Sequence, residues 1–257
     1  NLLREELEIK VKLLNHYVLD NLYADNGNIV WYFKGKELRI NSRQKLNQVL
    51  SRICDEVYPF TPVYKSELIN KTKVSGQIAL ARNKLIKKLL EDVNKPNLGF
   101  SDNEFPPEKS IYLTLLRKTC VHRAVNGIGI LDKPTDKTFA KLWEAGEKFL
   151  ESTRTKERSL VDFIQILSSR PFKLKQGFID LWVPIFLLIK HDEFALYEND
   201  AFIHDLSGDI FDLINKKPGL FKIKAFDVTG IKLQLFNRYR LMLNQAENKQ
   251  PNSKAFI

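Results

Sequence analysis

The sequence predicts a mainly α-helical protein with small β-hairpins, in which a helical domain with a helix-turn-helix-like element precedes a winged-helix-like domain. The first observation is that apolar residues recur at spacings of three and four over most of the chain, as in amphipathic helices. The second is the stretch 159–206. There an apolar-periodic segment, a break at Arg170-Pro171, a nearly uncharged run at 178–189 and two short alternating segments follow one another. Helix, turn, buried helix and hairpin is the element order of a winged helix.

Composition and charge limit the class of protein. A net charge of +10 over 257 residues favours acidic partners, nucleic acid first among them, whereas the alternative is a lysine-rich surface that serves solubility alone. Cys54 and Cys120 lie far apart without CxxC spacing, which indicates reduced thiols in a cytoplasmic protein and no zinc module. The apolar run 178–189 is shorter than the ~20 residues that a bilayer requires, so we expect no membrane segment. Because the chain starts inside a helical pattern without Met, we expect it to be part of a longer protein.

The first expected domain, residues 1–152, contains most of the predicted helices. Gly35, flanked by aromatic and β-branched residues, indicates a hairpin from 29 to 40, and Trp31 or Tyr32 in it is either a core residue or a stacking surface for bases. Residues 127–134 are expected to form a break between helices. The expected helices are 1–23, 42–58, 66–70, 75–92, 108–125 and 138–152.

A basic helix is the main candidate site in the first domain. The short helix 66–70, a turn and the longer helix 75–92 have the outline of a helix-turn-helix. The apolar stripe of the longer helix is expected to face the core, and its other face to meet an acidic partner; the alternative is a solvated face without a ligand. The residues assigned to this face are Arg82, Lys84, Lys87 and Lys88.

The second expected domain, residues 153–257, begins at the polar segment 153–156. Lys173 and Lys175 precede the apolar run and indicate a basic patch near its start. Pro184 is expected to kink or interrupt the helix in that run. The run has too few polar residues to read base edges, and the acidic turn at 198–200 would repel phosphates. Later elements are expected to be a helix at 209–215, strands at 221–229 and 231–236, a helix at 237–247 and a frayed tail.

No catalytic, cofactor or metal site is expected. The sequence GIGILDKP lacks the pattern of a phosphate-binding loop. Cys120 and His122, two positions apart, would not face the same way on a helix, so burial is favoured over a dyad. The adjacent residues at 191–193 and 204–205 would not converge on one ion.

Three segments in order carry a resemblance to a known family. They are SRICDEVYPFTPVYKSELINKTKVSGQIALARNKLIKKLL (51–90), FPPEKSIYLTLLRK (105–118) and RPFKLKQGFIDLWVPIFLLIKHDEFALYENDAFI (170–203). They resemble the region downstream of the nucleotide-binding core in very large bacterial P-loop ATPases of phage-defence systems, the BREX type with its BrxC- and PglY-like ATPases. The resemblance covers most of 51–221, but this chain has no Walker motif, so nothing of the ATP site carries over.

The sequence leaves three hypotheses of function. The resemblance implies a non-catalytic interaction and assembly module whose partners are other domains of the parent ATPase and proteins of the defence complex. The alternative is a winged-helix or helix-turn-helix module that contacts the backbone of duplex DNA, with Arg82, Lys84, Lys87, Lys88, Lys173 and Lys175 as the candidate contacts. An enzyme domain is the third hypothesis, and it would require a pocket with convergent titratable groups.

Overall fold

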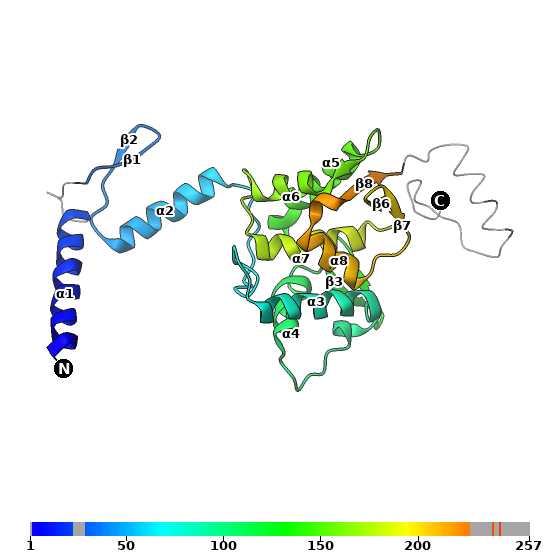
Figure 1. The fold of residues 1–257 in the computed structure, drawn as a ribbon, viewed down its shortest axis with the longest axis horizontal. Helices are drawn as coiled ribbons and strands as arrows, with labels where there is room; N and C mark the ends of the chain where they lie inside the picture. Colours follow the sequence, from blue (N-terminus) through cyan, green and yellow to red (C-terminus); the bar gives the residue numbers. More distant parts are fainter. Residues whose placement is uncertain (1, 23–28, 227–237, 239–241, 243–257) are drawn as a thin grey trace. The chain divides into compact units, whose positions relative to one another are not determined.

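The structure, a computed structural model, describes residues 2–22 and 29–226 together with the single positions 238 and 242 (Figure 1). It divides into two compact units, Asn1–Pro59 and Phe60–Ile257. The described residues form eight α-helices and three small antiparallel sheets, so the prediction of a mainly helical chain with small hairpins is confirmed. The elements expected beyond residue 226 lie outside the described residues, apart from positions 238 and 242, which are helical.

The first unit consists of two helices and a hairpin. Lys34 and Gly35 both have positive φ angles, 50° and 74°, which suits a two-residue hairpin turn. The second helix begins after Ser42, whose hydroxyl accepts a hydrogen bond from the Lys45 amide at 3.1 Å. The elements are α1 (Leu2–Leu22), β1 (Trp31–Phe33), β2 (Lys36–Leu38) and α2 (Arg43–Val57), as expected.

The second unit consists of six α-helices, a four-stranded sheet and a hairpin. Its helices are α3 (Gly76–Glu91), α4 (Pro107–Ile111), α5 (Ala140–Ser152), α6 (Leu160–Ser168), α7 (Gln176–Ile189) and α8 (Gly208–Lys216). Its strands are β3 (His122–Val125), β4 (Ile128–Leu131), β5 (Arg158–Ser159), β6 (Phe194–Glu198), β7 (Ala201–Ile203) and β8 (Phe221–Ala225). The larger sheet has the order β5-β8-β6-β7, and Leu196 of β6 pairs with Ile203 on one side and Ile223 on the other. The order helix, turn, buried helix and hairpin predicted for 159–206 is therefore present.

Two predicted helices of this unit are wrong. The segment 66–70 is a turn closed by one bond, from the Asn70 amide to the Ser66 carbonyl at 3.1 Å. The helix expected over 108–125 continues from α4 as a π-helix only to Arg117, and β3 follows. Cys120, with a φ of 58°, reverses the chain there. The β3–β4 hairpin turns at Asn126-Gly127, a pair that favours two-residue turns, where the sequence was expected to break.

The domain boundary expected at 153–156 falls inside one continuous core. Thr153 is fully buried, and its hydroxyl accepts a hydrogen bond from the Ala225 amide of β8 at 2.9 Å. The buried apolar cluster extends from Ile69 to Ala225 and includes side chains from both sides of residue 153. Residues 60–226 therefore share one hydrophobic core, and the division of the chain lies at Pro59–Phe60.

Helix α7 lies at the centre of this core. Its residues from Gly177 to Leu187 are buried, with Asp180 as the partly exposed exception. The helix continues through Pro184, which has no amide hydrogen to donate to the carbonyl of Asp180 four positions earlier. The side chain of Asn215 in α8 donates to that carbonyl at 3.0 Å instead. A side chain from α8 thus supplies the hydrogen bond that the proline removes.

A buried polar network joins α7 to α3 and α8. The Arg82 guanidinium lies 2.8 Å from one Asp180 carboxylate oxygen, and Gln176 donates to the other at 2.7 Å. Asn83 donates to Asp212 of α8 at 3.0 Å, and Asp212 also lies 3.7 Å from Arg82. The side chains of Arg82 and Asp180 are only 8% and 11% exposed, so this ion pair is a core contact.

Burial raises the pKa of the Asp180 carboxyl above its usual value, although the Gln176 hydrogen bond and the Arg82 charge act in the opposite direction. The desolvation of the carboxylate therefore outweighs its partners, as is common for buried ion pairs. The pair fixes the relative positions of α3 and α7 rather than adding much net stability.

We expect Asp180→Ala to lower the free energy of unfolding by about 3–5 kcal/mol, because it leaves the Arg82 charge buried without its carboxylate. Urea denaturation followed by circular dichroism measures this loss. The control is the double variant Arg82→Met with Asp180→Leu, which removes both charges and should recover most of the stability. A cost below about 1 kcal/mol for Asp180→Ala would contradict the assignment of a buried pair.

Candidate acidic-partner interface

Arg82 does not belong to an exposed basic face. Its guanidinium points into the core, where Asp180 neutralises its charge. The prediction that Arg82 contacts an acidic partner is therefore wrong. A glutamate at position 82 would face Asp180 at close range, so changing all four basic residues of this helix together would damage the fold instead of testing a surface.

The three other candidates on α3 differ in exposure. Lys84 and Lys87 are both 68% exposed, and their ammonium groups lie 3.8 Å from Glu108 and 3.7 Å from Glu91. Lys88 is less exposed because it binds Asp92 at 3.0 Å and the Leu98 carbonyl at 3.2 Å. The ammonium groups of Lys84 and Lys87 are therefore accessible to a partner on the surface. Lys88 instead binds the end of α3 to the loop that follows.

Lys173 and Lys175 lie in the turn between α6 and α7, and both are exposed. The residues that alternate with them, Phe172 and Leu174, are buried to 4% and 6% exposure. Burial of these two apolar side chains directs both lysines outward. Lys175 precedes the first residue of α7, and its ammonium group donates to the Asn70 carbonyl at 3.3 Å.

The fold brings a second basic segment to this turn. The Gly177 amide donates to the Lys71 carbonyl at 2.9 Å, and a Cβ atom at Gly177 would lie 2.6 Å from the Ile69 carbonyl oxygen. Only glycine therefore permits this approach. Lys71 and Lys73 are exposed beside the α6–α7 turn, and we call Lys71, Lys73, Lys173 and Lys175 the turn lysines.

The surroundings of the turn lysines contain few carboxylates. No Asp or Glu occurs from 68 to 90 or from 163 to 179, the two segments that meet at Gly177. Within the described ranges 2–22 and 29–226, none of the turn lysines has a carboxylate within ion-pair distance. No ion pair in the described part of the chain therefore neutralises their positive charge. Lys71 and Lys73 were not among the candidates predicted from the sequence, although the two segments without Asp or Glu are visible in it.

The remaining surface of the 159–206 element offers little to an anion. Gln176 is the exposed polar side chain in the first turn of α7, since Asp180 is held by Arg82. The β6–β7 turn carries Asp200, which forms an ion pair with Lys222 at 2.6 Å. A contact with phosphates would therefore involve the α6–α7 turn and not the hairpin.

Cys120 and His122 do not form a reactive pair. The His122 Nε2 atom lies 2.8 Å from the Val93 carbonyl, which can only accept, so Nε2 donates. Its Nδ1 atom then accepts from the Tyr112 hydroxyl at 3.0 Å. Both ring nitrogens serve the packing of β3 against its neighbours, and burial lowers the pKa of this imidazole.

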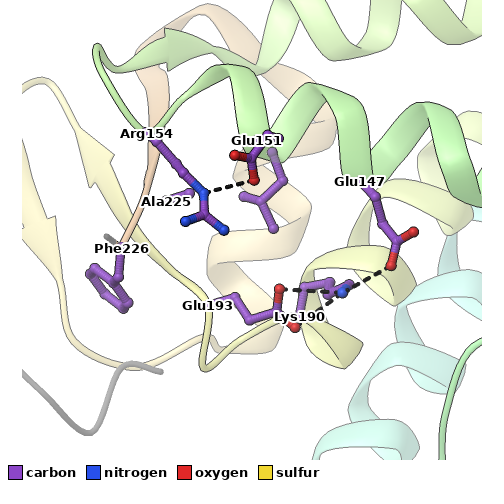
Figure 2. A pocket seen from close by; sticks show the side chains of 8 residues that line it. Glu147, Glu151, Arg154, Lys190, Glu193, Ala225 and Phe226 are labelled. Carbon is purple, nitrogen blue, oxygen red and sulfur yellow. Dashed lines mark hydrogen bonds and ion pairs between the residues drawn. The ribbon is translucent and has the colours of Figure 1, made fainter. Parts of the chain in front are cut away.

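A charged cavity of about 220 Å³ lies between α5 and the end of α7 (Figure 2). Arg154 contacts Glu151 at 2.7 Å, and Lys190 lies 3.2 Å from Glu147 and 3.0 Å from Glu193. Since its three carboxylates outnumber its two cations, this cavity does not suit an acidic partner. No set of three or more His, Cys, Asp or Glu in the described part of the chain is arranged to hold a metal ion.

Comparisons with protein-family models, with curated proteins and with solved structures find no match to this chain. None of the helices in the described ranges combines the length and the apolar character needed to cross a bilayer.

The His122 geometry predicts a pH dependence of stability. Burial holds the pKa of His122 in the folded state below the ordinary value of 6.5. The neutral ring therefore contributes fully to the free energy of unfolding above pH 6.5, and this contribution is lost as the pH falls through the folded-state pKa. We therefore expect an NMR titration to show neutral His122 with the proton on Nε2 at pH 6.5. A doubly protonated ring at that pH would contradict the buried arrangement.

Proposed function

We propose that this chain is a non-catalytic module of a large bacterial phage-defence P-loop ATPase, and that it contacts the phosphate backbone of duplex DNA through the turn lysines. The assignment to this type of ATPase rests on the resemblance of 51–90, 105–118 and 170–203. One observation supports the DNA contact: two lysine-containing segments that lack Asp and Glu meet at Gly177.

The position of the lysines supports this proposal. With α6, α7, β6 and β7 taken as a winged helix, 169–175 is the turn of its helix-turn-helix. In such motifs the start of the second helix faces the DNA, and the preceding helix crosses the backbone. Lys173 and Lys175 occupy that turn, and the Gly177 contact adds Lys71 and Lys73.

The proposed contact is to the backbone and not to base edges. Base reading needs several polar side chains on the inserted helix, and α7 offers Gln176 alone in its exposed first turn. Lysine contacts to phosphates position a protein without specifying sequence. We therefore expect binding that depends on salt and hardly on sequence.

Changing the turn lysines together to Glu should abolish binding to a labelled duplex of about 30 base pairs, measured by fluorescence anisotropy in a salt series. The unchanged chain should show a log-log salt slope of roughly −3 to −4, because four phosphates would be neutralised. The matched control reverses the same number of exposed charges at Lys118, Lys133, Lys137 and Lys156, and it should retain most of the affinity. Equal losses in both variants would leave only a general charge effect and refute the assigned surface.

Assembly with other proteins is the second candidate function, and α1 favours it. No residue of α1 is buried within the described chain, whereas most of the stability of helices in proteins comes from packing an apolar face against a partner. The first unit has nine basic and eight acidic residues, so nearly all of the net charge belongs to 60–257. The exposed large apolar residues of α1 are Leu2, Leu3, Leu7, Ile9, Val11, Leu13, Leu14, Tyr17 and Leu19.

For this second function, we expect the apolar side chains of α1 to pack against a protein surface of the parent ATPase. Changing Leu7 and Leu14, which are 62% and 61% exposed, to Lys should abolish co-purification with the purified remainder of that ATPase. Affinity for duplex DNA should stay unchanged, because the turn lysines belong to the other unit. Undiminished co-purification would exclude α1 as the assembly surface.

A further inference from the structure

A polar groove of about 670 Å³ lies next to the turn lysines. One wall is the segment 64–70, and the other is formed by Ser110 of α4 and Thr114 of the π segment that follows it. The segment 64–70 contributes Tyr64, Lys65, Ser66, Glu67, Leu68 and Asn70. Its volume falls in the roughly 300–1,000 Å³ range of small-molecule sites. Asn70 connects the groove to the basic surface, because its carbonyl accepts the hydrogen bond of Lys175.

Several polar groups in this groove have unused hydrogen-bonding capacity. The Ser66 residue is 3% exposed, and its hydroxyl has no hydrogen-bond partner among the described residues. Leaving a buried hydroxyl unpaired costs stability, so such a group calls for a functional explanation. Ser110 makes no side-chain hydrogen bond within the described chain, and Asn70 uses only its Oδ1, which accepts from Tyr64.

The backbone beside the groove is also unusual. Two residues after Ser110, at Tyr112, the helix changes from α to π geometry, and Thr114 lies in the π segment. The Thr114 hydroxyl donates back to the Ser110 carbonyl at 2.7 Å. Short π segments inside helices are rare and occur often at functional sites. This feature is independent of the charge of the turn lysines and of the unpaired Ser66 hydroxyl.

We propose that this groove binds the base of an unpaired nucleotide whose phosphates lie on the turn lysines. Donors and acceptors of Ser66, Asn70 and Ser110 suit the edge of a base, and Tyr64 and Leu68 supply apolar surface for its faces. A base inside a duplex is stacked and paired, so only an unpaired one can enter a concave site. This inference rests on the proposed backbone contact and adds a preference for DNA with a single-stranded segment.

The test compares a blunt labelled duplex with the same duplex carrying a short thymidine overhang. We expect the overhang to bind about tenfold more tightly, since one accommodated base contributes a factor of this order. Ser110→Trp, which fills the groove, should remove this preference and leave the affinity for the blunt duplex unchanged. The matched control is Thr155→Trp, at an exposed position outside the groove, which should keep the preference.

Equal affinity for the two probes in the unchanged chain would overturn the inference, as would a preference that survives Ser110→Trp. Competition by free thymidine monophosphate separates the sources of the nucleotide. If only single-stranded DNA displaces the overhang probe, the groove binds a base that belongs to a strand, as proposed. If the monophosphate binds while the overhang gives no preference over the blunt duplex, the proposal is overturned. Failure of the proposed function gives a different result, namely a blunt duplex that still binds after the turn lysines become Glu.

A second variant, Ser66→Ala, distinguishes a binding role from a structural one. Removal of an unpaired buried hydroxyl should raise the melting temperature. The same change should weaken binding of the overhang probe severalfold and leave the blunt duplex unaffected. A raised melting temperature with unchanged overhang affinity would overturn the role of Ser66 in the site.

Discussion

The Arg82–Asp180 pair is the contact that fixes the arrangement of helices in the second unit. It connects α3 to the second turn of α7, and the neighbouring Asn83–Asp212 bond extends the connection to α8. An ammonium or guanidinium group that neutralises a buried carboxylate is not available to a ligand. For this reason the most basic helix of the sequence offers less positive surface than its composition indicates, and the uncompensated charge lies on the turns.

The burial of α7 has a second effect on the surface. A helix whose whole length packs in the core cannot present side chains to a groove of DNA, so only its first turn and the segment before it remain accessible. Glycine at 177 then allows the 69–71 backbone to approach this first turn closely. The basic surface and the polar groove therefore adjoin each other at Asn70, which contributes its carbonyl to one and its side chain to the other.

Local signals in the sequence were sufficient for elements with clear caps and periodicity. The helices expected over 42–58 and 75–92 are present as α2 and α3, and Ser42 and Ser75 at their starts cap them. The β3–β4 hairpin was missed because the apolar residues before it continue a helical period, although Asn126-Gly127 signals a turn. The burial of Arg82 could not be predicted, since its partner lies 98 positions away. Lys173 and Lys175 were among the candidates predicted from the sequence, whereas placing Lys71 beside them required the tertiary contact at Gly177.

The proline in α7 has a consequence for the order of folding. The Asp180 carbonyl finds its hydrogen-bond partner 35 residues later, in Asn215, so α7 is fully satisfied only after α8 has docked. While the chain is being synthesised, its most apolar helix is complete before α8 leaves the ribosome. During that interval the nascent chain exposes apolar surface that α8 covers in the folded protein, and such transient exposure favours aggregation.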